Sequence, residues 1–242
     1  MLSGRKLLKI KVVNAKKIKD TQAGLSESLE NSILESVYRT GKELRFRFAN
    51  KALLGMHLML HGSLYLFEEN NENKFTIAEF YFDNNKGLAL TDYQASANIT
   101  LQPEDKKGID ALSNDLNYNY LKSALQSKAK IKNLITDQNV IRGIGNAYAD
   151  EILWEAGISP FSIASAISGN KIHALEKAIK TVLENAEQEI LKKNPGIITG
   201  EVRDFLKIHT KSKEISPTGA LIKVDKKGGR ITYYTDEQEL FV

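Results

Sequence analysis

The hydrophobic pattern of this 242-residue chain changes its period near the middle, and the change limits the folds open to it. In the first half, short runs of β-branched and aromatic residues alternate with polar turn formers, which predicts strands and one candidate helix at residues 23–38. The predicted strands include residues 7–13, 44–48, 63–67 and 75–82. A helical apolar stripe then runs from Ile172 to Ile190 and should end at Asn194-Pro195-Gly196. We therefore expect an α+β protein with more than one domain.

The order of these patterns predicts four segments. The helical spacing begins with Leu121, Leu125 and Ala129, after a polar stretch at residues 102–108. Two strand-like runs around Gly228-Gly229, residues 220–224 and 230–234, predict a β-hairpin. The expected segments are a β-sandwich at residues 1–104, a linker at 105–119, a helical domain at 120–208 and the hairpin at 209–242.

Composition excludes several kinds of site. The chain has no cysteine, so it cannot form disulfides, thiolate-ligated zinc sites, iron–sulfur clusters or a cysteine nucleophile. The four histidines do not supply another metal cluster, and we expect neither metal nor cofactor. No apolar run is long enough to span a bilayer and no secretory signal is visible, so we place the protein in the cytoplasm, associated with the nucleoid if it is bacterial.

The charge balance favours polyanionic partners. There are 34 Lys and Arg residues against 30 Asp and Glu residues, a formal net charge of +4. A solvated basic surface explains the total equally well. The distribution of the cations along the chain is therefore more informative than their number.

The densest chemical signal lies at residues 130–161. A helix should end near Thr136, and a second should begin near Asn146, which is a good N-cap residue. Gly143 and Gly145 allow close approach of the backbone, and Lys130, Lys132 and Arg142 add positive charge. Exposed amides at a helix N-terminus beside these residues form a site that suits a phosphate. A dinucleotide motif fails because Tyr148 occupies its third glycine position. A plain helical hairpin with a glycine turn remains the alternative.

Residues 137–151 resemble the helix–two-turn–helix signature of the formamidopyrimidine-DNA glycosylase and endonuclease VIII family of base-excision repair enzymes. The resemblance implies that Lys132 and Asn146 hold the phosphates that flank a lesion. Asp150 and Glu151 are adjacent on a helix and point in different directions. We therefore interpret them as structural or solvated residues and not as an acid–base pair.

The hairpin extends the resemblance. Residues 228–234 resemble the end of the family's zinc finger, whose arginine contacts DNA phosphates, and Arg230 takes that position. Without the family context, a solvated charge is the simpler interpretation of Arg230. The four zinc-binding cysteines of the usual finger would fall at Ile215, Thr218, Thr235 and Gln238. The segment is thus similar to the zincless fingers of some family members, in which hairpin packing replaces the metal.

The N-terminal half resembles the family more loosely. Residues 41–48 resemble a strand that presents a lysine near the scissile phosphate, which here would be Lys42. Residues 57–64 resemble the segment whose apolar side chain fills the gap left by an everted nucleotide, and the matching residue is Leu60. The alternative is that Met59 and Leu60 are buried strand residues.

The family's catalytic residues have no counterpart in these 242 residues. The resemblance implies chemistry by an N-terminal proline that forms a Schiff base and by a glutamate that protonates the opening sugar ring. Residues 2–8 already resemble the stretch after the first family helix. Two hypotheses follow: the protein evolved without its nucleophile, or Met1 is an internal methionine of a longer gene product, which we favour slightly. We expect borohydride to trap little or no adduct with abasic DNA.

The resemblance implies binding of damaged or abasic double-stranded DNA in a cleft between the domains. It also implies DNA glycosylase and AP lyase activity in the complete enzyme, acting as a monomer. The alternative is a catalytically inactive protein that binds DNA, or structured RNA, through the same phosphate contacts. Both hypotheses require the Asn146 turn and Arg230 to lie on the same side of the molecule, with neither of them buried under packed side chains.

Overall fold

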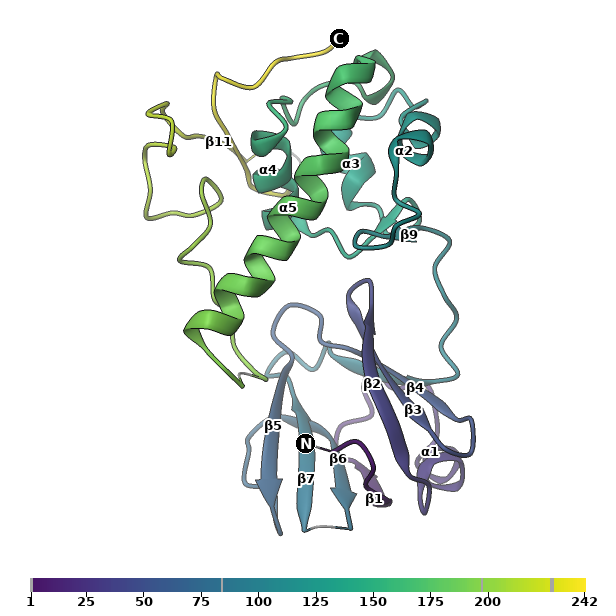
Figure 1. Cartoon of the computed structure of the whole chain (residues 1–242). Coiled ribbons are helices and arrows are strands. Elements are labelled where there is room, and N and C mark those ends of the chain that lie inside the picture. Colours follow the sequence, from purple (N-terminus) through teal and green to yellow (C-terminus); the bar gives the residue numbers. More distant parts are fainter. Residues whose placement is uncertain (1, 84, 197, 227–228) are drawn as a thin grey trace. The chain divides into compact units, whose positions relative to one another are not determined.

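The computed structural model describes residues 2–83, 85–196, 198–226 and 229–242, so Gly228 of the predicted hairpin turn lies outside the described residues. The chain divides into two compact units (Figure 1). Unit 1 comprises Met1–Asp105 with Ile197–Gly200, and unit 2 comprises Lys106–Gly196 with Glu201–Val242. The chain passes from unit 1 to unit 2 within the polar stretch at residues 102–108.

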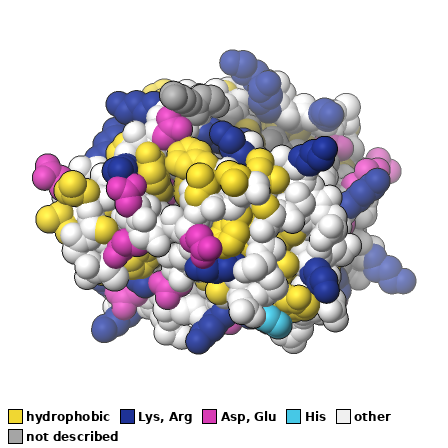
Figure 2. All heavy atoms as spheres, turned by 90° about the horizontal axis from the view of Figure 1, so that it is seen from above, with side chains coloured by type: hydrophobic (Ala, Val, Ile, Leu, Met, Phe, Trp, Pro, Cys, Tyr) yellow, Lys and Arg dark blue, Asp and Glu magenta, His cyan; other side chains and the backbone are white. Residues whose placement is uncertain are grey.

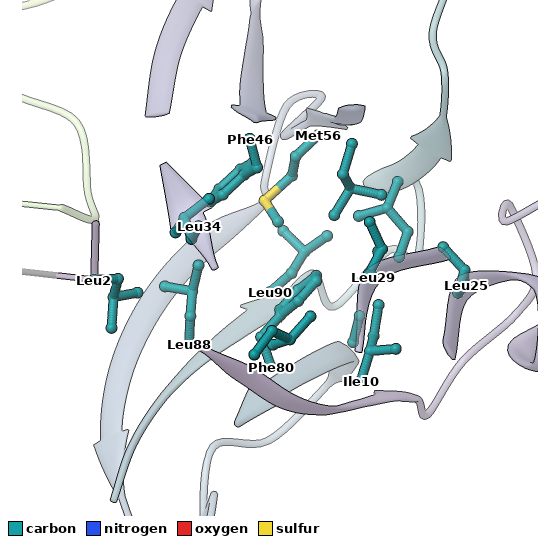
Figure 3. Packing of buried hydrophobic residues seen from close by; sticks show 14 of the residues in the cluster. Leu2, Ile10, Leu25, Leu29, Leu34, Phe46, Met56, Phe80, Leu88 and Leu90 are labelled. Atoms are coloured by element: carbon teal, nitrogen blue, oxygen red, sulfur yellow. The ribbon is translucent and has the colours of Figure 1, made fainter. Parts of the chain in front are cut away.

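Unit 1 is built from two four-stranded antiparallel sheets, with strand orders β1-β6-β7-β5 and β2-β3-β4-β8 (Figure 1). The strands are β1 (Leu7–Val12), β2 (Leu34–Thr40), β3 (Glu43–Phe48), β4 (Leu53–His57), β5 (Ser63–Glu68), β6 (Thr76–Phe82), β7 (Lys86–Thr91) and β8 (Asn98–Leu101). Side chains from both sheets meet in one hydrophobic core (Figure 3). Phe46 of one sheet stacks on Phe80 of the other, with ring centroids 6.4 Å apart. This packing of two sheets is the predicted sandwich.

The predicted strands of unit 1 correspond to β1, β3, β5 and β6. The candidate helix at residues 23–38 is correct only for its first part, because helix α1 (Gln22–Leu29) ends early and β2 starts at Leu34. Asn31 has a φ of 62°, a left-handed conformation that cannot continue a helix. The remaining residues of that stretch therefore join the sheet.

Unit 2 is mainly helical. Its elements are β9 (Ile109–Asp110), α2 (Tyr118–Ala124), α3 (Ile131–Thr136), β10 (Ile141–Arg142), α4 (Asn146–Glu155), the 3₁₀ helix η1 (Ala164–Ala166), α5 (Gly169–Lys193), β11 (Lys223–Asp225) and β12 (Thr232–Tyr234). Ile172, Leu175 and Ile179 of α5 are buried in the core of this unit, which confirms the apolar stripe. The helix ends at the predicted stop, with Asn194 as its C-cap. The prediction that one helix carries Leu121, Leu125 and Ala129 was wrong, because α2 ends at Ala124.

Two further segments belong to the packed part of unit 2. Ala111 and Leu116, which lie within the predicted linker at 105–119, are buried in its core. The C-terminal segment pairs with the loop after α4, because the Ser159 N–H donates to the Glu239 carbonyl and the Ile163 N–H to the Phe241 carbonyl, both at 2.8 Å. The segment that follows the hairpin is therefore attached to the helices.

Lys and Arg side chains are spread over the surface. On the face shown in Figure 2, hydrophobic side chains gather near the centre and dark blue cations lie around them. No helix among the described residues is long and apolar enough to cross a membrane. The location of a site therefore has to come from individual contacts and not from the total charge.

Candidate nucleic-acid interface

The turn between α3 and α4 is closed by one glutamine side chain. Gln138 Nε2 donates to the carbonyls of Thr136 at 2.9 Å and Ile144 at 3.0 Å, and its Oε1 accepts the N–H of Gly143 at 3.0 Å. Gly143 has a φ of 105°, which glycine adopts without strain. Gly143 thus shapes the turn, and its N–H donates inside the protein.

Helix α4 begins without a side-chain cap. The expectation that Asn146 is the N-cap was wrong: the N-cap is Gly145, and Asn146 is the first helical residue. The Asn146 side chain points elsewhere, because its Nδ2 donates to the main-chain carbonyl of Ile231 at 2.8 Å. That amide nitrogen has two N–H bonds, and this contact uses one of them. The uncapped first turn also keeps the partial positive charge of a helix N-terminus.

Lys132 is buried and faces three acceptors. Its Nζ lies 2.6 Å from Asp150 Oδ1, 2.8 Å from Thr232 Oγ1 and 3.2 Å from the Ile231 carbonyl. An ammonium group has three N–H donors, and these three acceptors occupy them. Burial lowers the pKa of Lys132, although the Asp150 carboxylate opposes the shift. In this structure Lys132 therefore attaches the hairpin to α3, while its charge remains beneath the surface.

Asp150 connects three parts of unit 2. Its carboxylate accepts the Tyr233 N–H at 2.9 Å and lies 2.7 Å from His209 Nδ1, in addition to the ion pair with Lys132. We call Asp150, Lys132, Thr232, Tyr233 and His209 the Asp150 network. The Asp150 side chain is fully buried, so the structural interpretation holds for it and the solvated one does not.

Glu151 is structural as well. Its two carboxylate oxygens accept the main-chain N–H groups of Lys207, Ile208 and His209 at 2.7–2.8 Å. Glu151 is 3% exposed. These contacts fix the segment that supplies His209 to the Asp150 network.

Arg230 lies beside the Asn146 turn. Its side chain is exposed, with Nη1 3.5 Å from Thr136 Oγ1 at the end of α3. The next residue, Ile231, offers its carbonyl to both Asn146 and Lys132. The structure thus places the Asn146 turn and Arg230 on the same side of unit 2. Arg230 is exposed, whereas Asn146 is half-buried, with its Oδ1 enclosed.

A surface hollow of about 360 Å³ adjoins Arg230. It is lined by Lys130, Lys132, Asn133, Thr136, Pro160, Phe161, Asp225, Arg230 and Thr232. The exposed Lys130 ammonium lies 5.5 Å from the centre of the Phe161 ring. Two exposed cations, Lys130 and Arg230, therefore face one concave surface at the start of α3 and on the hairpin.

Hydrogen bonds connect three of the four positions at which the usual zinc finger has cysteines, namely Thr218, Thr235 and Gln238. Glu237 Oε2 accepts the hydroxyls of Thr218 at 2.8 Å and Thr235 at 3.2 Å, while Gln238 bonds the Thr235 N–H and the Ile158 carbonyl. Ile215 is 55% exposed and lies outside this set. Within the described ranges, no group of three or more His, Cys, Asp or Glu residues could hold a metal ion. Packing and hydrogen bonds thus connect the two ends of the hairpin.

In unit 1, Leu60 stands on an exposed turn. Strand β4 ends at His57, and the Gly62 N–H closes the turn by donating to the Leu58 carbonyl at 2.8 Å. Leu60 is 81% exposed and Met59 is 50% exposed. The interpretation of both as buried strand residues was wrong, because the chain leaves the sheet before it reaches them.

A neighbouring loop presents a residue that sequence reasoning missed. Tyr93 is 59% exposed, and its ring centroid lies 4.7 Å from that of His61 in the Leu60 turn. The buried Asp92 carboxylate holds this loop by accepting the N–H groups of Gln94, Ser96 and Ala97 at 2.8–2.9 Å. Burial raises the pKa of Asp92, but these N–H groups outweigh it and keep the pKa below its ordinary value. The only sequence signal was an aspartate followed by an aromatic residue in a loop.

Lys42, the remaining candidate, lies in the turn between β2 and β3. Its side chain is exposed, and the preceding Gly41 has a φ of 58°. The strands on either side pair as Thr40 with Glu43. The turn therefore presents Lys42 at the end of a hairpin in unit 1.

Known proteins share this architecture. The sequence model of the family of formamidopyrimidine-DNA glycosylase N-terminal domains matches residues 1–99, and the sequence model of the H2TH domain family matches residues 108–194. The formamidopyrimidine-DNA glycosylase of Mycoplasma genitalium is 32% identical over 230 residues, which cover 87% of this chain and 80% of that protein.

Solved structures of the Lactococcus lactis enzyme are also similar. The enzyme bound non-covalently to DNA with an AP site has a TM-score of 0.87 and 24% identity, covering 98% of this chain and 94% of that one. The same enzyme with DNA that contains FAPY-dG has a TM-score of 0.84 and 23% identity, covering 97% and 92%. These likenesses confirm the α+β fold.

Proposed function

The chain belongs to the formamidopyrimidine-DNA glycosylase family, and from this premise we propose that it binds double-stranded DNA with a damaged base or an abasic site in base-excision repair. The observation that carries the proposal is the shared acceptor at Ile231, whose carbonyl contacts Asn146 and Lys132 directly beside Arg230. The proposal includes neither metal nor cofactor, and it takes the protein to act as a monomer.

In this proposal, the exposed groups of Arg230 and the Asn146 turn contact the DNA phosphates. The Arg230 guanidinium and the second Nδ2 N–H of Asn146 donate to phosphate oxygens, together with the amides that follow Gly145. Lys132 acts indirectly, because its donors are occupied by Asp150, Thr232 and Ile231. It holds the hairpin in place and adds positive potential below the phosphates.

Side chains of unit 1 make the proposed contacts to the damaged site. Extruding a nucleotide from a duplex costs a few kcal/mol of unstacking, which an inserted apolar side chain offsets in part. Leu60 is suited to this role because 81% of its surface is exposed on a closed turn. Tyr93 lies beside that turn and supplies a ring on which a base can stack. Lys42, in its own exposed turn, contacts a further phosphate.

The test measures the affinity of the protein for a duplex of about 20 base pairs that contains an abasic-site analogue, and for the same duplex undamaged. Fluorescence anisotropy gives both affinities over a range of salt concentrations. Arg230→Ala should weaken both affinities and reduce the salt slope by about one unit, since one phosphate contact is lost. Lys177→Ala removes an exposed cation from α5 and is the matched control, which should leave the slope nearly unchanged.

Two results would contradict the proposal. One is an Arg230→Ala variant with the affinity and the salt slope of the unaltered protein. The other is equal binding of the damaged duplex, the undamaged duplex and a structured RNA hairpin, which would favour a general polyanion surface.

A further inference from the structure

The β11–β12 hairpin has two faces, and the phosphate contacts use only one. Arg230 and Thr232 line the hollow beside α3, whereas Ile231 and Tyr233 line a different one. The second face borders a hollow of about 640 Å³ between the hairpin and residues 210–214, which we call the finger groove. We propose that the finger groove binds an acidic segment of a partner protein that carries apolar side chains.

The groove exposes apolar side chains that DNA binding does not explain. Leu221 is 68% exposed, Val224 is 47% exposed and Ile231 is 36% exposed, and all three line the hollow. Single exposed apolar residues are normal on a soluble protein, but several gathered in one concavity mark an interaction surface. A phosphate backbone offers these side chains no apolar surface, whereas a protein segment does.

The charges of the groove specify the partner further. Four lysines line it, at positions 211, 213, 223 and 226, against the single acidic residue Glu214. Lys223 is already paired with Asp236 at 2.6 Å and Lys213 donates to the Leu206 carbonyl, so the attraction for a partner's carboxylates comes mainly from the exposed Lys211 and Lys226. Apolar side chains surrounded by lysines are complementary to an acidic segment with spaced apolar residues.

A single-stranded nucleic acid fits the groove less well. Such strands are bound by stacking their bases on exposed aromatic rings. Among the described residues that line the groove, Tyr233 is the aromatic one, and it is only 6% exposed. Its ring packs on His209 with centroids 4.6 Å apart, and its N–H is held by Asp150. The groove thus lacks an accessible ring for a base.

The test uses the full chain and a fluorescein-labelled peptide in which leucines alternate with pairs of glutamates. Anisotropy should show saturable binding, and a peptide with serine in place of leucine or lysine in place of glutamate should bind about tenfold more weakly or not at all. Leu221→Ser and Lys211→Glu should each reduce peptide affinity by about tenfold. Both side chains are exposed, so neither change should unfold the protein.

The DNA site supplies the matched control. Arg230→Ala lies on the opposite face and should weaken duplex binding while peptide affinity stays the same; Leu221→Ser should do the reverse. If the unaltered protein binds the peptide but not the duplex, the result counts against the proposed function and not against the groove. The groove proposal is overturned if the peptide does not bind, if Leu221→Ser leaves its affinity unchanged, or if a single-stranded oligonucleotide binds the groove more tightly than the peptide.

Discussion

The Asp150 network supports the exposed Arg230 from below, whereas Leu60 and Tyr93 are themselves exposed on loops of unit 1, so the two regions position exposed side chains by opposite means. Around Asp150, the buried ion pair between Lys132 of α3 and Asp150 of α4, at 2.6 Å, holds the hairpin through the Thr232 hydroxyl at 2.8 Å and the Tyr233 N–H at 2.9 Å. The exposed Arg230 extends from this fixed base. Leu60 instead stands on a turn closed by a main-chain hydrogen bond, and Tyr93 on a loop whose N–H groups donate to the Asp92 carboxylate. We therefore expect the proposed phosphate contacts to depend on the stability of unit 2, and the proposed apolar contacts to depend on local turn geometry.

The largest effect should come from Asp150→Asn. The change leaves the Lys132 ammonium buried without its counter-ion, and breaking a buried pair in this way costs about 3–5 kcal/mol of unfolding free energy. Urea denaturation followed by circular dichroism measures the loss. Adding Lys132→Met to Asp150→Asn should recover part of it, because the unpaired charge is then gone. A cost below about 1 kcal/mol for the single variant would contradict this role of the buried ion pair, since it would mean that solvent replaces it.

A smaller, pH-dependent effect should come from Asp92→Asn. The pKa of Asp92 is below its ordinary value of 3.8 in the folded protein, so the ionised carboxylate stabilises the fold above that pH. This contribution is lost as the pH falls through the folded pKa. At pH 7 the variant should be less stable by about 1.5–3 kcal/mol, the value of hydrogen bonds to a charged group. The difference from the unaltered protein should shrink when both are unfolded in urea below pH 3.8.

A constant difference in stability across that pH range would contradict the expected role of the Asp92 charge. It would show that the Asp92 loop depends on the shape of the side chain and not on its charge. Asp83→Asn, at another loop of unit 1, is the control for the general effect of removing one carboxylate.

The smallest effect should come from Leu60→Ala and Tyr93→Ala. Each should weaken binding of an abasic duplex by about fivefold to tenfold, or roughly 1 kcal/mol, while leaving the thermal unfolding midpoint unchanged because both side chains are exposed. Affinity for undamaged duplex should stay within a factor of two or so. Equal losses on both duplexes would show that the pair does not respond to the lesion.

Local signals in the sequence were sufficient for much of this structure. The α5 stripe and its stop at Asn194 depend on residues close together in the chain, and so do the strands of the C-terminal hairpin. The family resemblance predicted that the Asn146 turn and Arg230 lie on the same side, and in the structure Asn146 donates to the carbonyl of Ile231, the residue after Arg230. That these residues contact DNA remains a prediction.

Long-range contacts account for what could not be predicted. Asn146 looked like a helix cap because its partner, the Ile231 carbonyl, lies 85 residues away. Lys132 looked like an exposed cation because Thr232, 100 residues further on, is needed to bury it. Tyr93 had no periodic pattern to mark it, and only the fold places it beside His61.

The atom that joins Asn146 and Lys132 to the hairpin belongs to the main chain of Ile231, not to its side chain. A point mutation at this codon leaves the carbonyl in place, so the residue type can drift across a lineage without weakening the hold on a duplex. The same side chain borders the finger groove. Substitutions at this position can therefore change the lining of the finger groove while the carbonyl contacts to Asn146 and Lys132 are inherited unaltered.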